Sequence, residues 1–165
     1  MNFTEFKLNA QILSGVKELG YETATPIQEK AIPSILAGLD VVGTAQTGTG
    51  KTAAFALPLL QRLMDGPRGQ LRGLILAPTR ELAEQIRQSI DRLAIRTGLR
   101  CTAIYGGANL VKQYQILRRG VDIVIACPGR LLDHINRGNI NLTQVEVLVL
   151  DEADHMFDLG FREPI

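Results

Sequence analysis

The sequence has few cysteines, almost no net charge and no long apolar run, and each shortage excludes a class of protein. The two cysteines, Cys101 and Cys127, are far apart and form no cluster with metal-site spacing; as reduced thiols they favour a cytoplasmic setting. A net charge of +1 provides no global basic field, which excludes a histone-like mode of binding nucleic acid. The apolar runs are only strand-sized, so none can span a bilayer, and the N-terminus lacks the pattern of a secretory signal.

What the chain does have is the composition of one globular domain, with 165 residues of which 45% are hydrophobic. Runs rich in valine, isoleucine and leucine predict five strands, at residues 40–44, 73–77, 101–105, 121–126 and 145–150. Most do not alternate with polar residues, as is typical of a parallel sheet buried on both faces. Helical patterns lie between them, and Thr25-Pro26 is typical of a helix cap. The alternation predicts a three-layer α/β domain with ligand sites at the carboxyl ends of the strands.

The segment Ala45–Thr52 fits the phosphate-binding loop pattern, with Ala45 where the commonest version has glycine. Gly48 and Gly50 permit the close approach and positive φ that let backbone N–H groups surround phosphates. A helix beginning near Lys51 would add its N-terminal partial charge, with Lys51 on the β- and γ-phosphates and Thr52 on Mg²⁺. The alternative is a glycine-rich turn with a chance Gly-Lys-Thr.

An acidic pair, Asp151-Glu152, directly follows the last apolar run. Such pairs are usually solvated turn residues, but a phosphate loop upstream favours a catalytic interpretation. Asp151 suits holding the metal, partly through water, and Glu152 suits positioning and polarising the attacking water. The two segments together predict a chain that binds ATP with Mg²⁺ and hydrolyses it, provided that they meet at one rim of the fold.

The string Asp151–Asp154, Asp-Glu-Ala-Asp, with the phosphate loop before it, resembles the DEAD-box RNA helicases. Residues 20–28 resemble the family's adenine-recognising Q motif, and three further segments resemble its RNA-contacting motifs. The resemblance extends from Phe3 to the last residue. It implies a RecA-like P-loop NTPase domain with a mostly parallel sheet and helices on both faces, acting as an ATP-dependent RNA helicase.

The resemblance also implies roles for single residues. Gln28 would bond the adenine edge, with an ordinary helix residue as the alternative, and Phe3 would stack on the base, with a core anchor as the alternative. Asp154 would couple nucleotide state to the second lobe. The implied catalytic residues are Glu152, Asp151 and Lys51, and the implied metal ligands are Thr52 and Asp151. The implied nucleotide contacts are Phe3, Tyr21, Thr23, Gln28, Ala45, Gln46, Thr47, Gly48, Thr49, Gly50, Lys51 and Thr52.

On the RNA side, Arg80 and Arg130 lie at the starts of predicted helices, a geometry that suits phosphate oxygens. Contacts to phosphate and sugar predict binding with little sequence preference. The alternative for Arg80 is a helix-surface ion pair with Glu84, four residues on. The implied RNA contacts are Pro78, Thr79, Arg80, Gly106, Gly107, Pro128, Gly129 and Arg130.

Four positions depart from the family's pattern or match no part of it. Cys127 stands where threonine usually precedes Pro-Gly-Arg, and a thiol is a poorer hydrogen-bond donor than a hydroxyl. Ala24 stands where proline is common, which loosens a turn without removing a ligand. His134 and His155 match no catalytic role and are interpreted as helix-surface residues.

We expect residues 1–30 to form the Q-motif region of one domain and residues 31–165 a first RecA-like helicase domain that is incomplete at its C-terminus. The sequence lacks the family's Ser-Ala-Thr segment and its second RecA-like domain, and residues 162–165 do not resemble a helix end. The expected partners are therefore RNA and the second lobe of a longer chain, with no membrane. A non-catalytic adaptor and a DNA-directed relative are the alternatives.

Overall fold

The computed structural model describes residues 1–161 and 165. The chain forms two compact units, unit 1 from Met1–Gly66 and Ser89–Leu99, and unit 2 from Pro67–Gln88 and Arg100–Ile165. Each unit is described by itself below. The expectation that residues 162–165 do not resemble a helix end concerns mainly residues 162–164, which lie outside the described residues.

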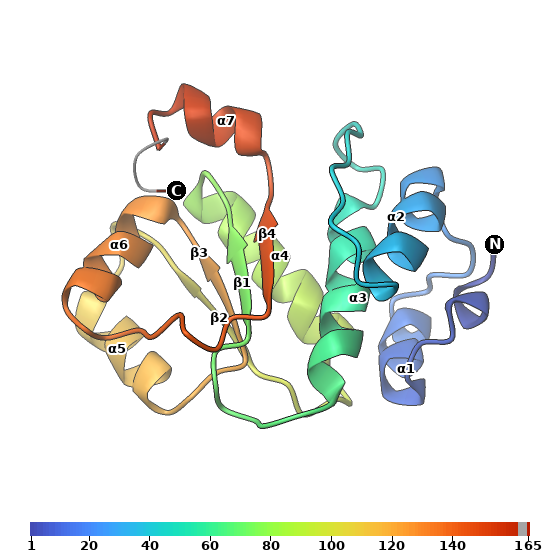
Figure 1. The fold of residues 1–165 in the computed structure, drawn as a ribbon, viewed down its shortest axis with the longest axis horizontal. Coiled ribbons are helices and arrows are strands. Elements are labelled where there is room, and N and C mark those ends of the chain that lie inside the picture. The colour runs from blue at the N-terminus through green and yellow to red at the C-terminus, as the bar shows by residue number, and fades with distance from the viewer. Residues whose placement is uncertain (162–164) are drawn as a thin grey trace. The chain divides into compact units, whose positions relative to one another are not determined.

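Unit 2 is built on a four-stranded sheet in which every pairing is parallel, as the sequence predicts (Figure 1). The strand order is β2-β3-β1-β4. In register, Leu76 at the end of β1 faces Ala126 of β3 on one side and Leu150 of β4 on the other. The carboxyl ends of these strands therefore lie at one edge. The strands are β1 (Gly73–Leu76), β2 (Cys101–Ile104), β3 (Ile123–Ala126) and β4 (Val147–Leu150).

Helices cover both faces of this sheet, which confirms the α/β class. One face packs against Leu131 of α6 (Pro128–Asn136) and Met156 of α7 (Ala153–Asp158), with Leu117 of α5 (Leu110–Arg118) beside them. On the opposite face, Cys101 Sγ lies 3.7 Å from the carbonyl oxygen of Arg87 in α4 (Arg80–Leu93). β1 and β3 are buried throughout, as their unbroken apolar runs predict. The shared sheet-side cluster comprises Leu74, Leu76, Ile104, Val121, Val124 and Ala126.

A buried carboxylate, Asp122, fastens the loops at the amino ends of the strands. Its Oδ1 accepts the N–H of Gly69 at 2.7 Å and its Oδ2 accepts the N–H of Arg100 at 2.8 Å. Its backbone oxygen also accepts the N–H of Gly73 at 3.0 Å. Because a buried charge is stable only when it is hydrogen-bonded, these bonds allow the carboxylate to lie in the interior.

Unit 1 begins with a 3-10 turn, η1 (Phe3–Phe6), and three helices, α1 (Ala10–Glu18), α2 (Pro26–Leu36) and α3 (Lys51–Met64). The chain leaves α1 through Gly20 at φ 72°, and Thr25 is the N-cap of α2, as the sequence predicts. α2 packs against α3, and α1 contributes the fully buried Ile12 to the core. None of the helices in the described part of the chain has the length and apolar content that a bilayer crossing requires.

The expected strand at residues 40–44 is wrong. The structure has no helix or strand there, and the Val42 side chain is 98% exposed. A strand needs a neighbour for its N–H and C=O groups. The described elements of unit 1 are helical apart from a single antiparallel bridge between Asn2 and Thr23, so this short run has no strand in its own unit to pair with.

Candidate functional site

The predicted phosphate loop in unit 1 leads directly into α3, which begins at Lys51 as expected. Gly48 and Gly50 have φ of 83° and 87°, in the left-handed region that favours glycine. Thr49 closes the turn by donating from Oγ1 to the carbonyl oxygen of Gln46 at 2.7 Å. The loop residues thus lie at the amino end of a 14-residue helix, where N–H groups without intrahelical partners and the helix dipole favour an anion.

Gln28 connects the adenine-motif segment to this loop. The side chain is only 3% exposed, its Oε1 accepts the Thr25 N–H at 2.9 Å, and its Nε2 donates to the Gly50 carbonyl oxygen at 3.0 Å. A side chain at position 50 would collide with the Gln28 amide, which is a second reason for glycine there. The Thr25 hydroxyl is buried nearby, and the described residues provide it with no hydrogen-bond partner. The predicted adenine contact stays a prediction.

Phe3 lies in the core of unit 1, as the core-anchor alternative describes. Its side chain is 3% exposed and meets Phe6 edge-on, with ring centroids 5.9 Å apart. The ring of Tyr21 stacks against it at a centroid distance of 6.2 Å. The role of Phe3 in stacking on a base stays a prediction, which would require one ring face to be uncovered.

In unit 2, the segments that follow the four strands begin at the same edge of the sheet. The ladder of hydrogen bonds continues one residue past three of the strands: Ala77 N–H to Ala126 O, Cys127 N–H to Ile104 O, and Asp151 N–H to Leu76 O, each at 3.0 Å. Residues 78–80, 105–107, 128–130 and 151–154 therefore leave the sheet side by side. The structure brings together the predicted RNA segments and the acidic motif, which are distant in sequence.

The acidic motif has an unusual backbone. Glu152 adopts φ 52° and ψ 50°, a left-handed conformation that is costly for a residue with a side chain, and it is the N-cap of α7. Asp151 Oδ1 accepts the Glu152 N–H at 3.1 Å, and His155 Nδ1 lies 3.3 Å from Glu152 Oε2. Strained positions of this kind cluster at functional sites. His155 is partly exposed, which fits its interpretation as a helix-surface residue.

Arg80 lies over the aromatic ring of Tyr105, with 5.0 Å from its guanidinium carbon to the ring centroid. The predicted alternative, an ion pair with Glu84, is not what the structure shows, because Glu84 is bonded by Arg87, whose Nε donates to it at 2.8 Å. That bond lowers the pKa of Glu84. The cation–π contact holds Arg80 beside the segment that continues into Gly106.

Arg130 connects the third RNA segment to the second. Its side chain is 14% exposed, and its Nη1 donates to the carbonyl oxygen of Ala108 at 3.0 Å and to Gln113 Oε1 at 3.1 Å. Ala108 follows Gly107, whose φ of 77° turns the chain at this point. A side chain of the third segment is therefore bonded to the backbone oxygen of the residue that directly follows the second.

The prediction that His134 lies on a helix surface is wrong. The side chain is fully buried, with Nε2 3.2 Å from Gln113 Oε1 and Nδ1 3.2 Å from Asn139 Nδ2. Burial lowers its pKa.

The sequence analysis did not include Tyr105, Gln113 or His134 in the predicted site. The sequence did contain one signal for Gln113, which lies on the same helical face as Leu110 and Leu117. A polar residue on an apolar helical face indicates a buried hydrogen bond.

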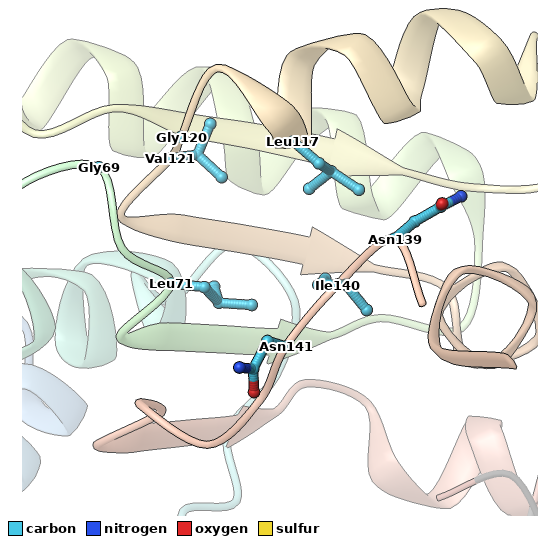
Figure 2. Close-up of a pocket in the computed structure, with 8 residues that line it drawn as sticks. All are labelled: Gly69, Leu71, Leu117, Gly120, Val121, Asn139, Ile140 and Asn141. Atoms are coloured by element: carbon cyan, nitrogen blue, oxygen red, sulfur yellow. The ribbon is translucent and has the colours of Figure 1, made fainter. Parts of the chain in front are cut away.

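A small cavity of about 150 Å³ lies at the other end of the sheet, near the amino ends of β1 and β3 (Figure 2). It includes none of the predicted site residues. Asn139, which bonds His134, lies on its wall. The lining residues are Gly69, Leu71, Leu117, Gly120, Val121, Asn139, Ile140 and Asn141.

The parallel sheet covered by helices, the phosphate-loop sequence at a helix start and the acidic pair at a strand end define a RecA-like domain of the P-loop NTPase class. The family model described as DEAD/DEAH box helicase matches residues 25–165. The chain belongs to the DEAD/DEAH box helicase family.

Curated relatives match over nearly the whole chain. The ATP-dependent RNA helicase CshA of Listeria monocytogenes is 48% identical over 99% of this chain and 31% of its own length. The protein of the same name from Limosilactobacillus reuteri is 46% identical over 100% of this chain and 33% of its own length. The chain thus spans about a third of the length of these relatives.

Solved structures show the same fold. The RNA-helicase Prp28 from Chaetomium thermophilum, solved bound to ADP, is 43% identical with a TM-score of 0.92, over 99% of this chain and 41% of that one. A DEAD box protein from Methanococcus jannaschii is 42% identical, also with a TM-score of 0.92, over 99% of this chain and 45% of its own.

Proposed function

We propose that this chain is the ATP-binding first lobe of an ATP-dependent RNA helicase. In the full-length protein, ATP binding and hydrolysis would drive local unwinding of RNA duplexes or remodelling of RNA–protein complexes. The observation that carries the proposal is the glycine loop at the start of α3, hydrogen-bonded to Gln28 through Gly50. This arrangement joins a phosphate-binding element to a residue of the adenine motif.

The nucleotide contacts divide by chemistry. The Lys51 ammonium would bind the β- and γ-phosphates, and backbone N–H groups of residues 47–52 would surround them. The Gln28 amide has a second N–H and a second acceptor lone pair, which could meet the adenine edge and select it over guanine. The exposed ring of Tyr21 offers aromatic surface for the base, and Phe3, which is buried beneath it, would take part only once one of its own ring faces is uncovered.

The hard oxygen donors of Thr52 and Asp151 suit Mg²⁺, which prefers hydroxyl, carboxylate and phosphate ligands. When bound, the metal would neutralise negative charge on the phosphates. Glu152 would orient and polarise the attacking water, from the left-handed backbone position that directs its side chain. That residues of the two units meet around the nucleotide stays a prediction from the sequence.

For RNA, we propose that the strand-end edge of unit 2 binds the phosphate–sugar backbone. Arg80 and Arg130 provide charge, the starts of α4 and α6 provide N–H groups, and Gly107 allows a close approach. Contacts of this kind carry little base information, so we expect little sequence preference. Domain 1 would comprise residues 31–165 with residues 1–30 as its Q-motif region, and Asp154 would couple it to a second RecA-like domain.

The test is a titration of fluorescently labelled ADP, with GDP as competitor. Because a charge-assisted hydrogen bond is worth about 1.5–3 kcal/mol, we expect Lys51→Ala to weaken ADP binding roughly 10- to 100-fold. Gln28→Ala should remove the preference for ADP over GDP. The exposed Lys30 of α2 provides the matched control, and Lys30→Ala should bind like the wild type. Equal ADP affinity in Lys51→Ala and wild type would refute the phosphate-loop assignment.

A further inference from the structure

Gln113, on α5, bonds three groups at the strand-end edge of unit 2. Its Nε2 donates to the carbonyl oxygen of Tyr105 at 3.1 Å. Its Oε1 accepts from Arg130 Nη1 at 3.1 Å and lies 3.2 Å from His134 Nε2. The Gln113 side chain is buried, so these protein groups and not bulk water orient it.

We propose that Gln113 is a positioning residue for RNA binding, which holds the Arg130 guanidinium against the Gly106–Gly107 turn without touching RNA itself. This inference rests on the proposed contact between Arg130 and an RNA phosphate. It adds to that contact a residue that belongs to none of the segments resembling RNA-contacting motifs.

The donors and acceptors fix the direction of the amide. The Tyr105 carbonyl oxygen can only accept, so the Gln113 NH₂ group must face it and the Gln113 oxygen must face Arg130. That oxygen has two lone pairs, which serve Arg130 and His134. His134 therefore carries its proton on Nε2, and its Nδ1 accepts from Asn139 Nδ2.

The same bonds fix the direction of Arg130. The two hydrogens of Nη1 are directed to Ala108 O and Gln113 Oε1, and Nε lies 3.9 Å from Asp133 Oδ2. Because a guanidinium is planar, fixing one nitrogen by two bonds fixes the whole group. The Nη2 edge is then the part that can meet a phosphate, already oriented before RNA arrives, and such preorganisation lowers the entropic cost of binding.

Packing alone would not require a glutamine here. Leu110 and Leu117 occupy the same helical face, and an apolar side chain at position 113 would fill similar volume with no polar group to satisfy. The chain instead buries an amide and an imidazole beside an arginine, an arrangement that is stable only when every bond is made. The contribution of the Gln113 amide is therefore to orient the Arg130 guanidinium.

The test is a double-mutant cycle in the full-length protein, read by the affinity for a fluorescein-labelled oligouridylate. We expect Arg130→Ala to weaken binding about tenfold or more, and Gln113→Met, which keeps the shape but not the amide, to weaken it several-fold. In the Arg130→Ala background, Gln113→Met should change affinity less than twofold, because its effect acts through the arginine. Gln115→Met, on an exposed position of the same helix, is the matched control.

Further measurements separate positioning from loss of fold. Thermal unfolding is recorded for every variant, and Gln113→Asn, which withdraws the amide by one methylene, replaces Gln113→Met if that variant does not fold. In ¹⁵N spectra, the His134 ring should be neutral with its proton on Nε2 in the wild type, and its signals should move in Gln113→Met but not in Gln115→Met.

The outcomes distinguish the inference from the proposed function. If Arg130→Ala binds the oligouridylate like the wild type, the RNA role of Arg130 and the inference both fail. If Arg130→Ala weakens binding but the Gln113 variants do not, or if their effects add to that of Arg130→Ala, only the inference fails.

Discussion

At the residue scale, His134 provides a test of stability against pH. The imidazole is buried, and burial lowers its pKa below the ordinary value, with Arg130 and Arg137 acting in the same direction and Asp133 opposing them. The folded state thus holds His134 neutral under conditions where the unfolded chain binds a proton. The contribution of His134 to stability is therefore complete above about pH 6.5 and is lost as pH falls towards the folded pKa.

We expect the free energy of unfolding by urea to fall between pH 7.5 and 5.5, with His134 contributing no more than about 1.4 kcal/mol per pH unit, the limit for one proton. His134→Gln should flatten this part of the profile. His155→Gln, at a partly exposed position in the same unit, should leave the His134 contribution to the profile unchanged. A profile that is the same in His134→Gln and wild type would contradict the assignment.

Also at the residue scale, the sequence did not predict the surroundings of the site residues. The RNA roles that the motifs give Arg130 and Arg80 stay predictions, whereas His134 is buried and not on a surface, and Arg80 lies on Tyr105 and not in an ion pair with Glu84. Neither Gln113 nor Tyr105 belongs to a motif with its own chemistry. Their roles come from contacts between α5, α6 and the end of β2, which depend on tertiary packing.

At the element scale, α6 lacks a side-chain cap. Cys127 is its N-cap, with φ −78° and ψ 135°, yet its thiol makes no capping hydrogen bond. Burial raises the pKa of this thiol to about 11, so it stays protonated at neutral pH. Cys127→Thr would place an oxygen where it can accept an N–H from the first turn, and we expect it to raise the free energy of unfolding by about 0.5–1 kcal/mol.

Urea denaturation of Cys127→Thr against wild type measures this gain. Cys101→Thr is the matched control, because Cys101 lies in β2 and caps no helix. A gain in both variants would point to the removal of a thiol and not to capping, and no gain in Cys127→Thr would contradict the prediction.

Four of the five expected strands form, each with one end as predicted and the other shorter by one or two residues. They could be predicted because the apolar runs at 73–77 and 121–126 are long enough to be buried on both faces. The run at 40–44 has only Val41 and Val42 between polar and glycine neighbours. A strand also depends on a neighbour, which local sequence does not reveal.

At the scale of the whole molecule, the proposed chemistry is divided between the two units. Lys51 and Thr52 belong to unit 1, and Asp151 and Glu152 belong to unit 2. The chain also spans about a third of the length of its curated relatives. Phosphoryl transfer depends on positioning and on stabilisation of charge, so we expect catalysis to be far more sensitive than binding to the loss of any group that completes the site.

We therefore expect the 165-residue chain to bind labelled ADP weakly and to show negligible ATP turnover and no unwinding, whereas the full-length protein turns over ATP in the presence of RNA. Full-length Glu152→Gln sets the baseline, because removing general-base assistance should slow hydrolysis about 10²- to 10⁴-fold while leaving nucleotide binding intact. Phosphate release measured at saturating ATP and Mg²⁺ should place the 165-residue chain at that baseline. Sustained turnover well above it would show that closure by a second lobe is not required for chemistry, since these residues alone would then suffice.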